Sequence, residues 1–208
     1  MAHSRESLYQ TSVFINCPFD GEYLPIFRAI AFTVSVCGFV PRTTLEHDDA
    51  SQVRLEKIYR LIESSALGIH DISRTELDEE NQLPRFNMPL ELGFFLGAKQ
   101  FGTGRHRSKR CLVLDREPYR FQKFISDIAG QDIKAHGNSP ETVIRTVRDW
   151  LRNAVGQGKM PGGSRLWTRY QEFTMGLRDM CERAELTPEH LTFPDFYGLV
   201  LEWISLNS

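Results

Sequence analysis

Long hydrophobic runs are missing from this chain of 208 residues: none approaches the ~20 apolar residues that a membrane-spanning helix needs. The first residues, MAHSRESLYQTS, also lack the apolar segment of a secretory signal. Neither sign of charge is in large excess: the chain has 25 Lys and Arg and 27 Asp and Glu, which gives a net charge of −2. We therefore expect neither a membrane nor a nucleic acid as a partner.

Pairs of cysteines at metal-binding spacing are also missing. The four cysteines are scattered along the chain, at Cys17, Cys37, Cys111 and Cys181. Cys17 and Cys111 fall in apolar runs typical of strands, where a reduced thiol acts as a small hydrophobic group. We therefore expect a reduced, cytoplasmic protein whose site holds neither a metal nor another cofactor.

What the chain does contain is a regular alternation of strand and helix patterns. The runs typical of strands cover residues 12–19, 39–45, 67–73, 110–115 and 131–137. The helical patterns follow them at 23–38, 50–66, 86–98, 119–130 and 140–155. Five such β-α units predict an α/β fold, a five-stranded parallel sheet of flavodoxin or Rossmann type flanked by helices.

The composition divides the chain into three parts. Residues 1–155 form the predicted α/β domain. The stretch GQGKMPGGS (156–164) has the composition of a flexible linker. Residues 165–208 form a C-terminal extension with two helical patterns that carry aromatic faces. We expect these aromatic faces to be core, or a docking face for a partner protein or a second protomer.

One helical stretch, FNMPLELGFFLGA (86–98), places a carboxylate among apolar residues. An unpaired carboxylate is costly to bury, so Glu91 is expected at a cleft, in a pair, or retained for chemistry. Asn87 is a candidate N-cap, and Glu91 lies about one turn further on. Its carboxylate can therefore point back toward the ends of the strands. The simpler alternative is a solvated or salt-bridged helix residue.

Candidate ligand-binding residues cluster where the predicted strands end. Ligands of an open parallel sheet bind outside the carboxyl ends of the strands, where the strand order reverses. The residues expected there are Asn16, Phe19 and Asp20 after the first strand, Arg42 after the second, Asp71, Ser73 and Arg74 after the third, and Arg85 and Asn87 before the helix of Glu91. Their acids, amides and guanidinium groups suit a polar ligand with hydroxyls or phosphates. Asp71 could instead simply cap a turn.

Three motifs carry a resemblance to a known group of proteins. VFINCPFDGEY (13–23), GIHDISR (68–74) and LELGFFLGA (90–98) resemble the nucleoside 2-deoxyribosyltransferases and the TIR-like α/β proteins, over about residues 12–137. The resemblance implies that Glu91 attacks or stabilises the anomeric carbon of a ribosyl group, and that Asp71 is the acid near the base. It also implies that Asn16, Phe19 and Asp20 belong to a loop that closes over the ligand.

The function implied by this resemblance is cleavage of an N-glycosidic bond in NAD or a related nucleotide or nucleoside, by hydrolysis or by ribosyl transfer. Arg74 and Arg85 favour a nucleotide, because arginine binds phosphate bidentately. The resemblance further implies a homo-oligomer and a role as a bacterial antiphage effector. The alternative is a non-catalytic nucleotide sensor that signals to a partner protein through the C-terminal helices.

Two further features have plain structural interpretations. His70 lies inside the third predicted strand and is expected to be a core histidine, with its neighbour Asp71 on the opposite side of the strand. The basic loop GTGRHRSKR (102–110) precedes a strand rather than a helix, and we expect a solvated connection there.

Overall fold

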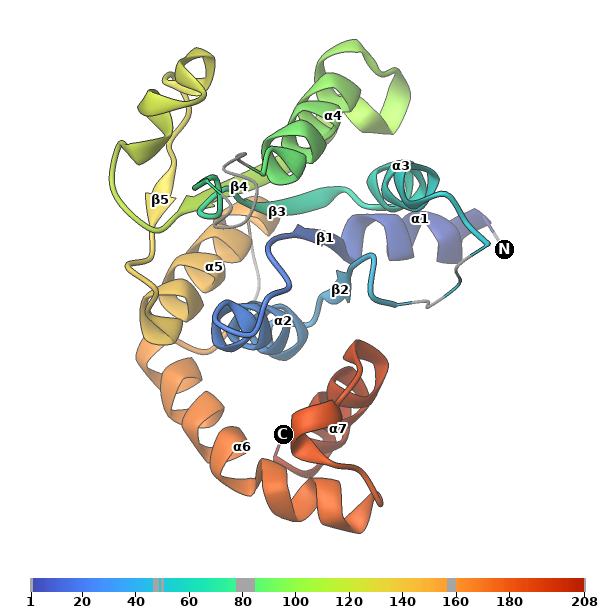
Figure 1. Cartoon of the computed structure of the whole chain (residues 1–208). Helices are drawn as coiled ribbons and strands as arrows, with labels where there is room; N and C mark the ends of the chain where they lie inside the picture. Colours follow the sequence, from blue (N-terminus) through green and yellow to red (C-terminus); the bar gives the residue numbers. More distant parts are fainter. Residues whose placement is uncertain (1, 47–48, 50, 78–84, 157–159, 208) are drawn as a thin grey trace.

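Five parallel strands form one sheet in the order β2-β1-β3-β4-β5, which confirms the predicted α/β fold (Figure 1). The computed structural model describes residues 2–46, 49, 51–77, 85–156 and 160–207. The strands are β1 (Ser12–Asn16), β2 (Val40–Arg42), β3 (Leu67–Asp71), β4 (Arg110–Asp115) and β5 (Lys134–Ala135). Strand β3 is central, and β2 lies at an edge of the sheet. An edge strand tolerates Pro41, which has no backbone N–H to donate to a neighbouring strand.

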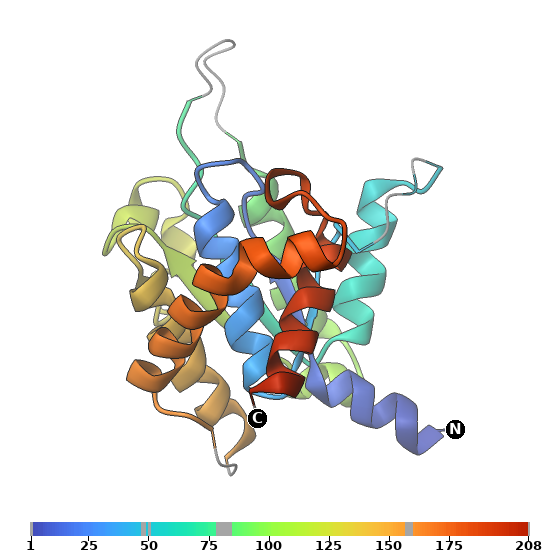
Figure 2. The ribbon, with the colours of Figure 1, turned by 90° about the horizontal axis from the view of Figure 1, so that it is seen from below.

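Helices cover the two faces of the sheet unequally (Figure 1). Helices α3 (Arg54–Ser64) and α4 (Asn87–Phe101) lie on one face. Helices α2 (Leu24–Val36) and α5 (Pro140–Val155) lie on the other. There, α6 (Gly163–Arg183) and α7 (Phe193–Leu206) add an outer layer over α2 (Figure 2).

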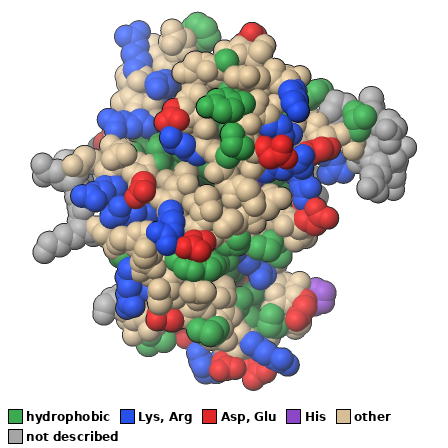
Figure 3. All heavy atoms as spheres, turned by 90° about the vertical axis from the view of Figure 1, so that its left-hand side faces the viewer, with side chains coloured by type: hydrophobic (Ala, Val, Ile, Leu, Met, Phe, Trp, Pro, Cys, Tyr) green, Lys and Arg blue, Asp and Glu red, His purple; other side chains and the backbone are tan. Residues whose placement is uncertain are grey.

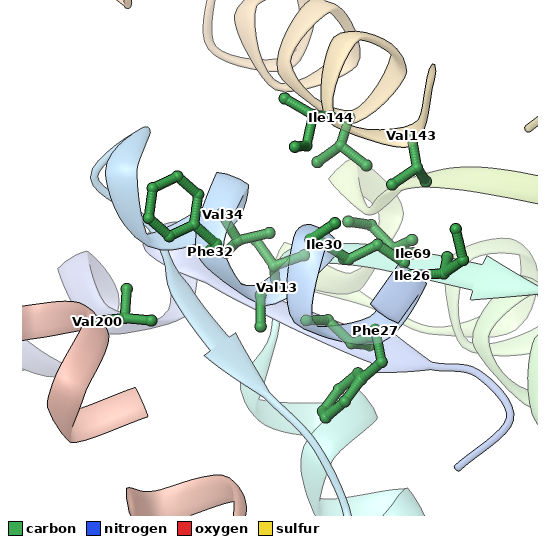
Figure 4. Close-up of a cluster of buried hydrophobic side chains, with 14 of the residues drawn as sticks. Val13, Ile26, Phe27, Ile30, Phe32, Val34, Ile69, Val143, Ile144 and Val200 are labelled. Carbon is green, nitrogen blue, oxygen red and sulfur yellow. The ribbon is translucent and has the colours of Figure 1, made fainter. Parts of the chain in front are cut away.

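The larger core surrounds α2, which packs between β1 and β3 of the sheet and the helices α5, α6 and α7 (Figure 4). Phe32 of α2 shows how the C-terminal helices join this core. Its ring lies 5.2 Å from the rings of both Tyr170 and Phe173 in α6, and 5.5 Å from that of Trp203 in α7. The aromatic side chains of residues 165–206 therefore contribute to the same core as the sheet.

The face of the sheet under α3 and α4 has a smaller core. Phe14 of β1 packs with Ile58 and Leu61 of α3 and with Phe95 of α4. Gly68 of β3 makes this packing possible, because a Cβ atom there would lie 2.8 Å from the ring of Phe95.

Two predictions of local structure are wrong. Residues 119–130 form two short 3₁₀ helices, Arg120–Lys123 and Ser126–Ile128, instead of one helix. Arg120 is drawn inward here, since its Nε donates to Asp115 and its Nη2 to the carbonyl of Ile72, both at 2.7 Å. The N-cap of α4 is Phe86 rather than Asn87, and its side chain makes no capping hydrogen bond.

The predicted solvated connection at 102–110 is confirmed for most of its residues, and Lys109 is the exception. Lys109 in this loop is fully buried. The N-terminal residues form a helix, α1 (Ala2–Thr11), that the sequence pattern did not indicate. Tyr9 of α1 is buried, and its hydroxyl donates to the carbonyl of Arg105.

Among the described residues, none of the helices combines the length and the apolar character that crossing a membrane requires. On the face seen in Figure 3, positive and negative side chains are intermixed, as expected from the near-neutral charge of the chain.

Candidate functional site

The strand order places the candidate site between β1 and β3. After β1 the chain moves outward to β2, and then crosses over to β3 on the other side of β1. The loops that follow β1 and β3 therefore diverge, which leaves a crevice at their carboxyl ends. The first residues of α3 and α4 lie at the same edge, because both helices run back along the sheet.

A cavity of about 340 Å³ lies at this edge. Its walls come from the loop after β1, the start of α3, the segment after β3 and the start of α4. The lining residues are Cys17, Pro18, Phe19, Asp20, Arg54, Arg74, Arg85, Asn87 and Met88. Five predicted site residues are thereby brought together: Phe19, Asp20, Arg74, Arg85 and Asn87.

Glu91 lies one turn beyond the cavity wall, on α4. Side chains of a helix tilt toward its N-terminus, so the carboxylate of Glu91 covers the turn that contains Asn87 and Met88. The side chain is only 6% exposed, and its Oε1 lies 3.9 Å from Nη2 of Arg54. Burial raises the pKa of Glu91 to about 7, and the opposing effect of Arg54 is smaller. Glu91 is thus a carboxyl group that changes charge near neutral pH.

Arg54 is the charged residue of the cavity that sequence reasoning missed. It is the first residue of α3, and its side chain is half-exposed. It lines the cavity and also faces Glu91. A usable signal existed in the sequence, since a helix that returns from the carboxyl edge of a parallel sheet must begin at that edge. The predicted helix at 50–66 placed Arg54 inside the helix instead of at its start, so the position of Arg54 at the edge of the sheet was not recognised.

The loop after β1 is tied to the segment after β3 by charge. Nη2 of Arg74 lies 3.1 Å from Oδ1 of Asp20 and 2.5 Å from Oε2 of Glu22. The same Oδ1 of Asp20 accepts a hydrogen bond from the backbone N–H of Tyr23. Arg74 therefore holds one wall of the cavity against the other.

Asn16, at the end of β1, positions α4 rather than lining the cavity. Its Nδ2 donates to the carbonyl of Met88 at 3.0 Å and lies 3.1 Å from Nδ1 of His70. His70 is buried against the rings of Phe14 and Phe95. Burial lowers the pKa of His70 to about 3, so this imidazole is neutral and serves as an acceptor for Asn16.

Asp71 lies on the opposite side of β3 from His70, in a buried polar cluster. Its Oδ2 accepts a hydrogen bond from the hydroxyl of Tyr23 at 2.7 Å. Its Oδ1 accepts from the backbone N–H and from the hydroxyl of Ser73. Nε2 of His136 lies 3.0 Å from Oδ2, although without the alignment of a hydrogen bond. Asp71 and Ser73 are thus engaged with each other and with their neighbours, beside the cavity residues but not among them.

Arg42 lies in a different hollow. Its Nε and Nη2 bind the carboxylate of Glu46 at 2.8 and 2.9 Å. A separate cavity of about 190 Å³ contains both residues, together with Lys57 and Arg60 of α3. The structure therefore separates Arg42 from the residues grouped around Glu91.

A thiol nucleophile and a bound metal ion are two other kinds of chemistry to consider in the cavity. Burial, reinforced by the charges of Asp71, Glu91 and Asp20, raises the pKa of Cys17 well above its ordinary value. A thiol that stays protonated is a poor nucleophile, so Cys17 fits the role of a small hydrophobic group. No cluster of three His, Cys, Asp or Glu side chains in the part of the chain that the structure describes is arranged to hold a metal ion.

Comparison with models of protein families, with curated proteins and with solved structures finds no significant match. The resemblance of the three motifs is therefore a hypothesis about the chemistry, and the geometry of the site is the evidence that bears on it.

Proposed function

We propose that this protein cleaves the N-glycosidic bond of NAD or a related nucleotide, and that Glu91 is its catalytic carboxylate. The observation that carries the proposal is the position of Glu91, a buried acid one turn behind a polar cavity at the β1/β3 crevice. Burial of an ionisable group next to a cavity costs stability, and such groups concentrate at functional sites.

The chemistry requires an anion beside the anomeric carbon. As the C1′–N bond breaks, its electron pair leaves with the base and positive charge develops on C1′. Ionised Glu91 stabilises that charge or bonds to C1′, and water then supplies the oxygen that replaces the base. The proton lost by this water ends on the departing base or in solvent. Transfer to a second base is the same reaction with the base in place of water.

The arginines that line the cavity support a substrate with phosphate groups. Arg54 is half-exposed and faces the cavity, so its guanidinium is accessible to a phosphate oxygen. In this proposal Asp71 does not contact the reacting atoms and acts through its neighbours. It fixes Tyr23 at the start of α2 and Ser73 after β3, and so holds the two loops that form the cavity.

A second candidate function is a nucleotide sensor without turnover. The observation that favours it is the position of Phe19, which lines the cavity and also lies in a small hollow with Phe193 and Phe196 of α7. Movement of the loop after β1 would therefore shift the C-terminal helices. A partner protein, or the activity of an effector, would then respond to that shift.

The experiment that tests the proposal is mass-spectrometric analysis of purified protein incubated with NAD, nucleotides and deoxynucleosides. Release of a free base above a heat-inactivated control supports cleavage and identifies the substrate. A nucleotide that raises the melting temperature without any product on long incubation supports the sensor instead.

A further inference from the structure

A second cavity, the Arg42 cavity, lies between the end of β2 and one side of α3 and has a volume of about 190 Å³. Its lining residues are Arg42, Thr43, Thr44, Glu46, Gln52, Lys57, Arg60, Leu61 and Ser64. None of these residues lines the cavity in front of Glu91, so the two hollows are separate. A ligand held by Arg42 therefore binds apart from the β1/β3 crevice.

Arg42 and the backbone of Thr43 together form a receptor for an oxyanion, which the chain fills with its own Glu46. Nε and Nη2 of Arg42 donate to the two carboxylate oxygens of Glu46 at 2.8 and 2.9 Å. The backbone N–H of Thr43 donates to the same carboxylate at 2.8 Å. A guanidinium fork binds carboxylates and phosphates in the same way. Glu46 thus indicates the class of ligand that this part of the cavity accepts, an oxyanion.

The contact of Arg42 with Glu46 is one that a ligand can replace. The Arg42 side chain is 23% exposed and that of Glu46 is 17% exposed. Water therefore weakens their attraction, and ion pairs within reach of solvent contribute little to stability. Glu46 also lies in the turn after β2, outside any helix or strand. Its side chain can turn away without disturbing a regular element.

The wall of the Arg42 cavity carries more positive than negative charge. Its cations are Arg42, Lys57 and Arg60, and its carboxylate is that of Glu46. Arg60 pairs with Glu56 on the exposed surface of α3, and we leave it out of the site. The charges of Arg42 and Lys57 together match a doubly charged anion in the place of Glu46. A phosphate group carries about that charge near neutral pH.

The hydroxyl of Thr44 adds a donor that Glu46 does not use. Oγ1 of Thr44 is buried in the wall of the cavity and has no hydrogen-bond partner in the described part of the chain. Buried hydroxyls rarely lack a partner, so this group indicates a missing ligand atom. The two oxygens of the Glu46 carboxylate already accept from Arg42 and Thr43. A phosphate group has further oxygens and can accept from Thr44 as well.

We propose that the Arg42 cavity is a second ligand site, that it binds a phosphate group, and that Glu46 occupies it when this ligand is absent. The phosphate accepts from the guanidinium of Arg42, the backbone N–H of Thr43 and the hydroxyl of Thr44. The charge of Lys57 lies beside it. The ligand is either free phosphate or a small phosphomonoester. This proposal does not depend on the proposed activity, because no residue of the crevice takes part.

Isothermal titration calorimetry with inorganic phosphate, at low ionic strength, tests this site. The wild-type protein is expected to bind with a dissociation constant of about 1 mM or below. Arg42→Gln is expected to weaken binding about tenfold or more, because charge-assisted hydrogen bonds are lost. Glu46→Gln is expected to tighten binding about threefold, because a competing carboxylate is removed.

Thr44→Val is a second variant, whose side chain keeps its shape and loses only the hydroxyl without a partner. It is expected to weaken phosphate binding about threefold. Circular dichroism checks that each variant is folded. Glycerol 3-phosphate that binds more tightly than inorganic phosphate, with the same response to Thr44→Val, identifies the ligand as a phosphomonoester. Weaker binding of glycerol 3-phosphate identifies it as free phosphate.

Matched controls come from Arg178 and Glu182, another pair four residues apart, which is exposed on α6. Arg178→Gln and Glu182→Gln change the net charge as Arg42→Gln and Glu46→Gln do, and both are expected to leave phosphate binding unchanged. Arg54→Gln separates the two cavities, because Arg54 lines only the crevice. Phosphate binding to the Arg42 cavity is expected to survive this change.

Three results would overturn the proposal. The first is a wild-type protein that binds no phosphate at about 10 mM. The second is a Glu46→Gln variant that binds phosphate no more tightly than Glu182→Gln, because Glu46 would then not occupy the place of the ligand. The third is binding that Arg54→Gln abolishes and Arg42→Gln retains, because the phosphate would then lie in the crevice.

Discussion

Glu91 and Arg54 face each other between α4 and α3, with Oε1 of Glu91 3.9 Å from Nη2 of Arg54. This separation is at the limit of an ion pair, and the arginine is half-exposed to solvent while the glutamate is buried. The desolvation of Glu91 therefore outweighs the attraction of Arg54, and the pKa of the carboxyl group rises to about 7. The first two expectations depend on that balance.

The first expectation concerns stability and pH. In the folded protein the pKa of Glu91 is about 7, above its ordinary value of 4.5. The folded state therefore binds the proton more tightly, and the free energy of unfolding falls as pH rises from about 4.5 through 7. Glu91→Gln removes this loss. We expect the variant to exceed the wild type by on the order of 2 kcal/mol at pH 8, with little difference near pH 4.5.

Urea denaturation of both proteins at the two pH values measures this difference. Other carboxyl groups titrate in both proteins and cancel in the comparison. An equal difference at both pH values would show that Glu91 does not have the raised pKa inferred from its burial.

The second expectation concerns Arg54. Its positive charge lowers the pKa of Glu91, so Arg54→Gln should raise that pKa further. If ionised Glu91 is the reactive form, kcat/KM rises with pH, and the rising limb of the variant lies at higher pH than that of the wild type. We expect kcat below pH 7 to fall about two- to fivefold, separately from any change in KM.

Arg60→Gln is the matched control for this measurement. Arg60 lies on the same helix, is exposed, pairs with Glu56, and lines the separate cavity of Arg42. Superimposable pH profiles for Arg54→Gln and the wild type would remove Arg54 from the account of Glu91.

The sheet and most of its helices could be predicted, because apolar periodicity reports burial directly. The match is close for Arg110–Asp115 and for Pro140–Val155. The prediction of one helix at 119–130 was wrong, because the conformation of this segment depends on Arg120, whose guanidinium donates to the carbonyl of Ile72, 48 residues away in the chain. Local patterns carry no information about such contacts.

The site was predictable to a similar degree. The rule that ligands bind at the carboxyl ends of strands predicted that Asp20, Arg74 and Asn87 lie together, and all three line one cavity. It could not separate Arg42, which lies at the end of the edge strand and binds Glu46. Nor could it place Arg54, whose role depends on how α3 and α4 pack.

The third expectation concerns Lys109, which sequence reasoning assigned to a solvated loop. Its Nζ donates to the carbonyl of Ile62 at 2.5 Å and to that of Ser65, at the end of α3. The ammonium also lies 4.9 Å from the centre of the ring of Phe95. Lys109→Met leaves two buried carbonyls without this donor, so we expect the free energy of unfolding to fall by about 2 kcal/mol.

Chemical denaturation at pH 7 measures this loss. Lys99→Met is the control, since Lys99 lies exposed in the last turn of α4 and its replacement should change stability by less than ~0.5 kcal/mol. Equal effects of the two substitutions would show that Lys109 does not hold the end of α3.

The fourth expectation concerns Asp71. Its carboxylate accepts from Tyr23 and Ser73, so Asp71→Asn replaces one buried acceptor by a donor. We expect the free energy of unfolding to fall by about 2 kcal/mol, because a hydroxyl or amide loses its partner. If Asp71 acts only by holding the loops, the pH dependence of kcat/KM keeps its wild-type shape.

A changed pH profile for Asp71→Asn, at a temperature where the variant is fully folded, would instead assign Asp71 a direct part in the reaction. That outcome would agree with the role that the resemblance of GIHDISR implies for Asp71, the acid near the base. It would contradict the positioning role inferred from the contacts of Asp71.

The most direct test of the account is the rate of base release by Glu91→Gln, measured by mass spectrometry with the nucleotide that the wild type cleaves. We expect a loss of at least ~1000-fold with nucleotide binding retained, because the amide cannot stabilise or trap the developing cation. Glu117→Gln, a change at an exposed carboxylate, is expected to release base at the wild-type rate. Release of base by Glu91→Gln as fast as by the wild type would contradict the assignment of Glu91 as the catalytic carboxylate.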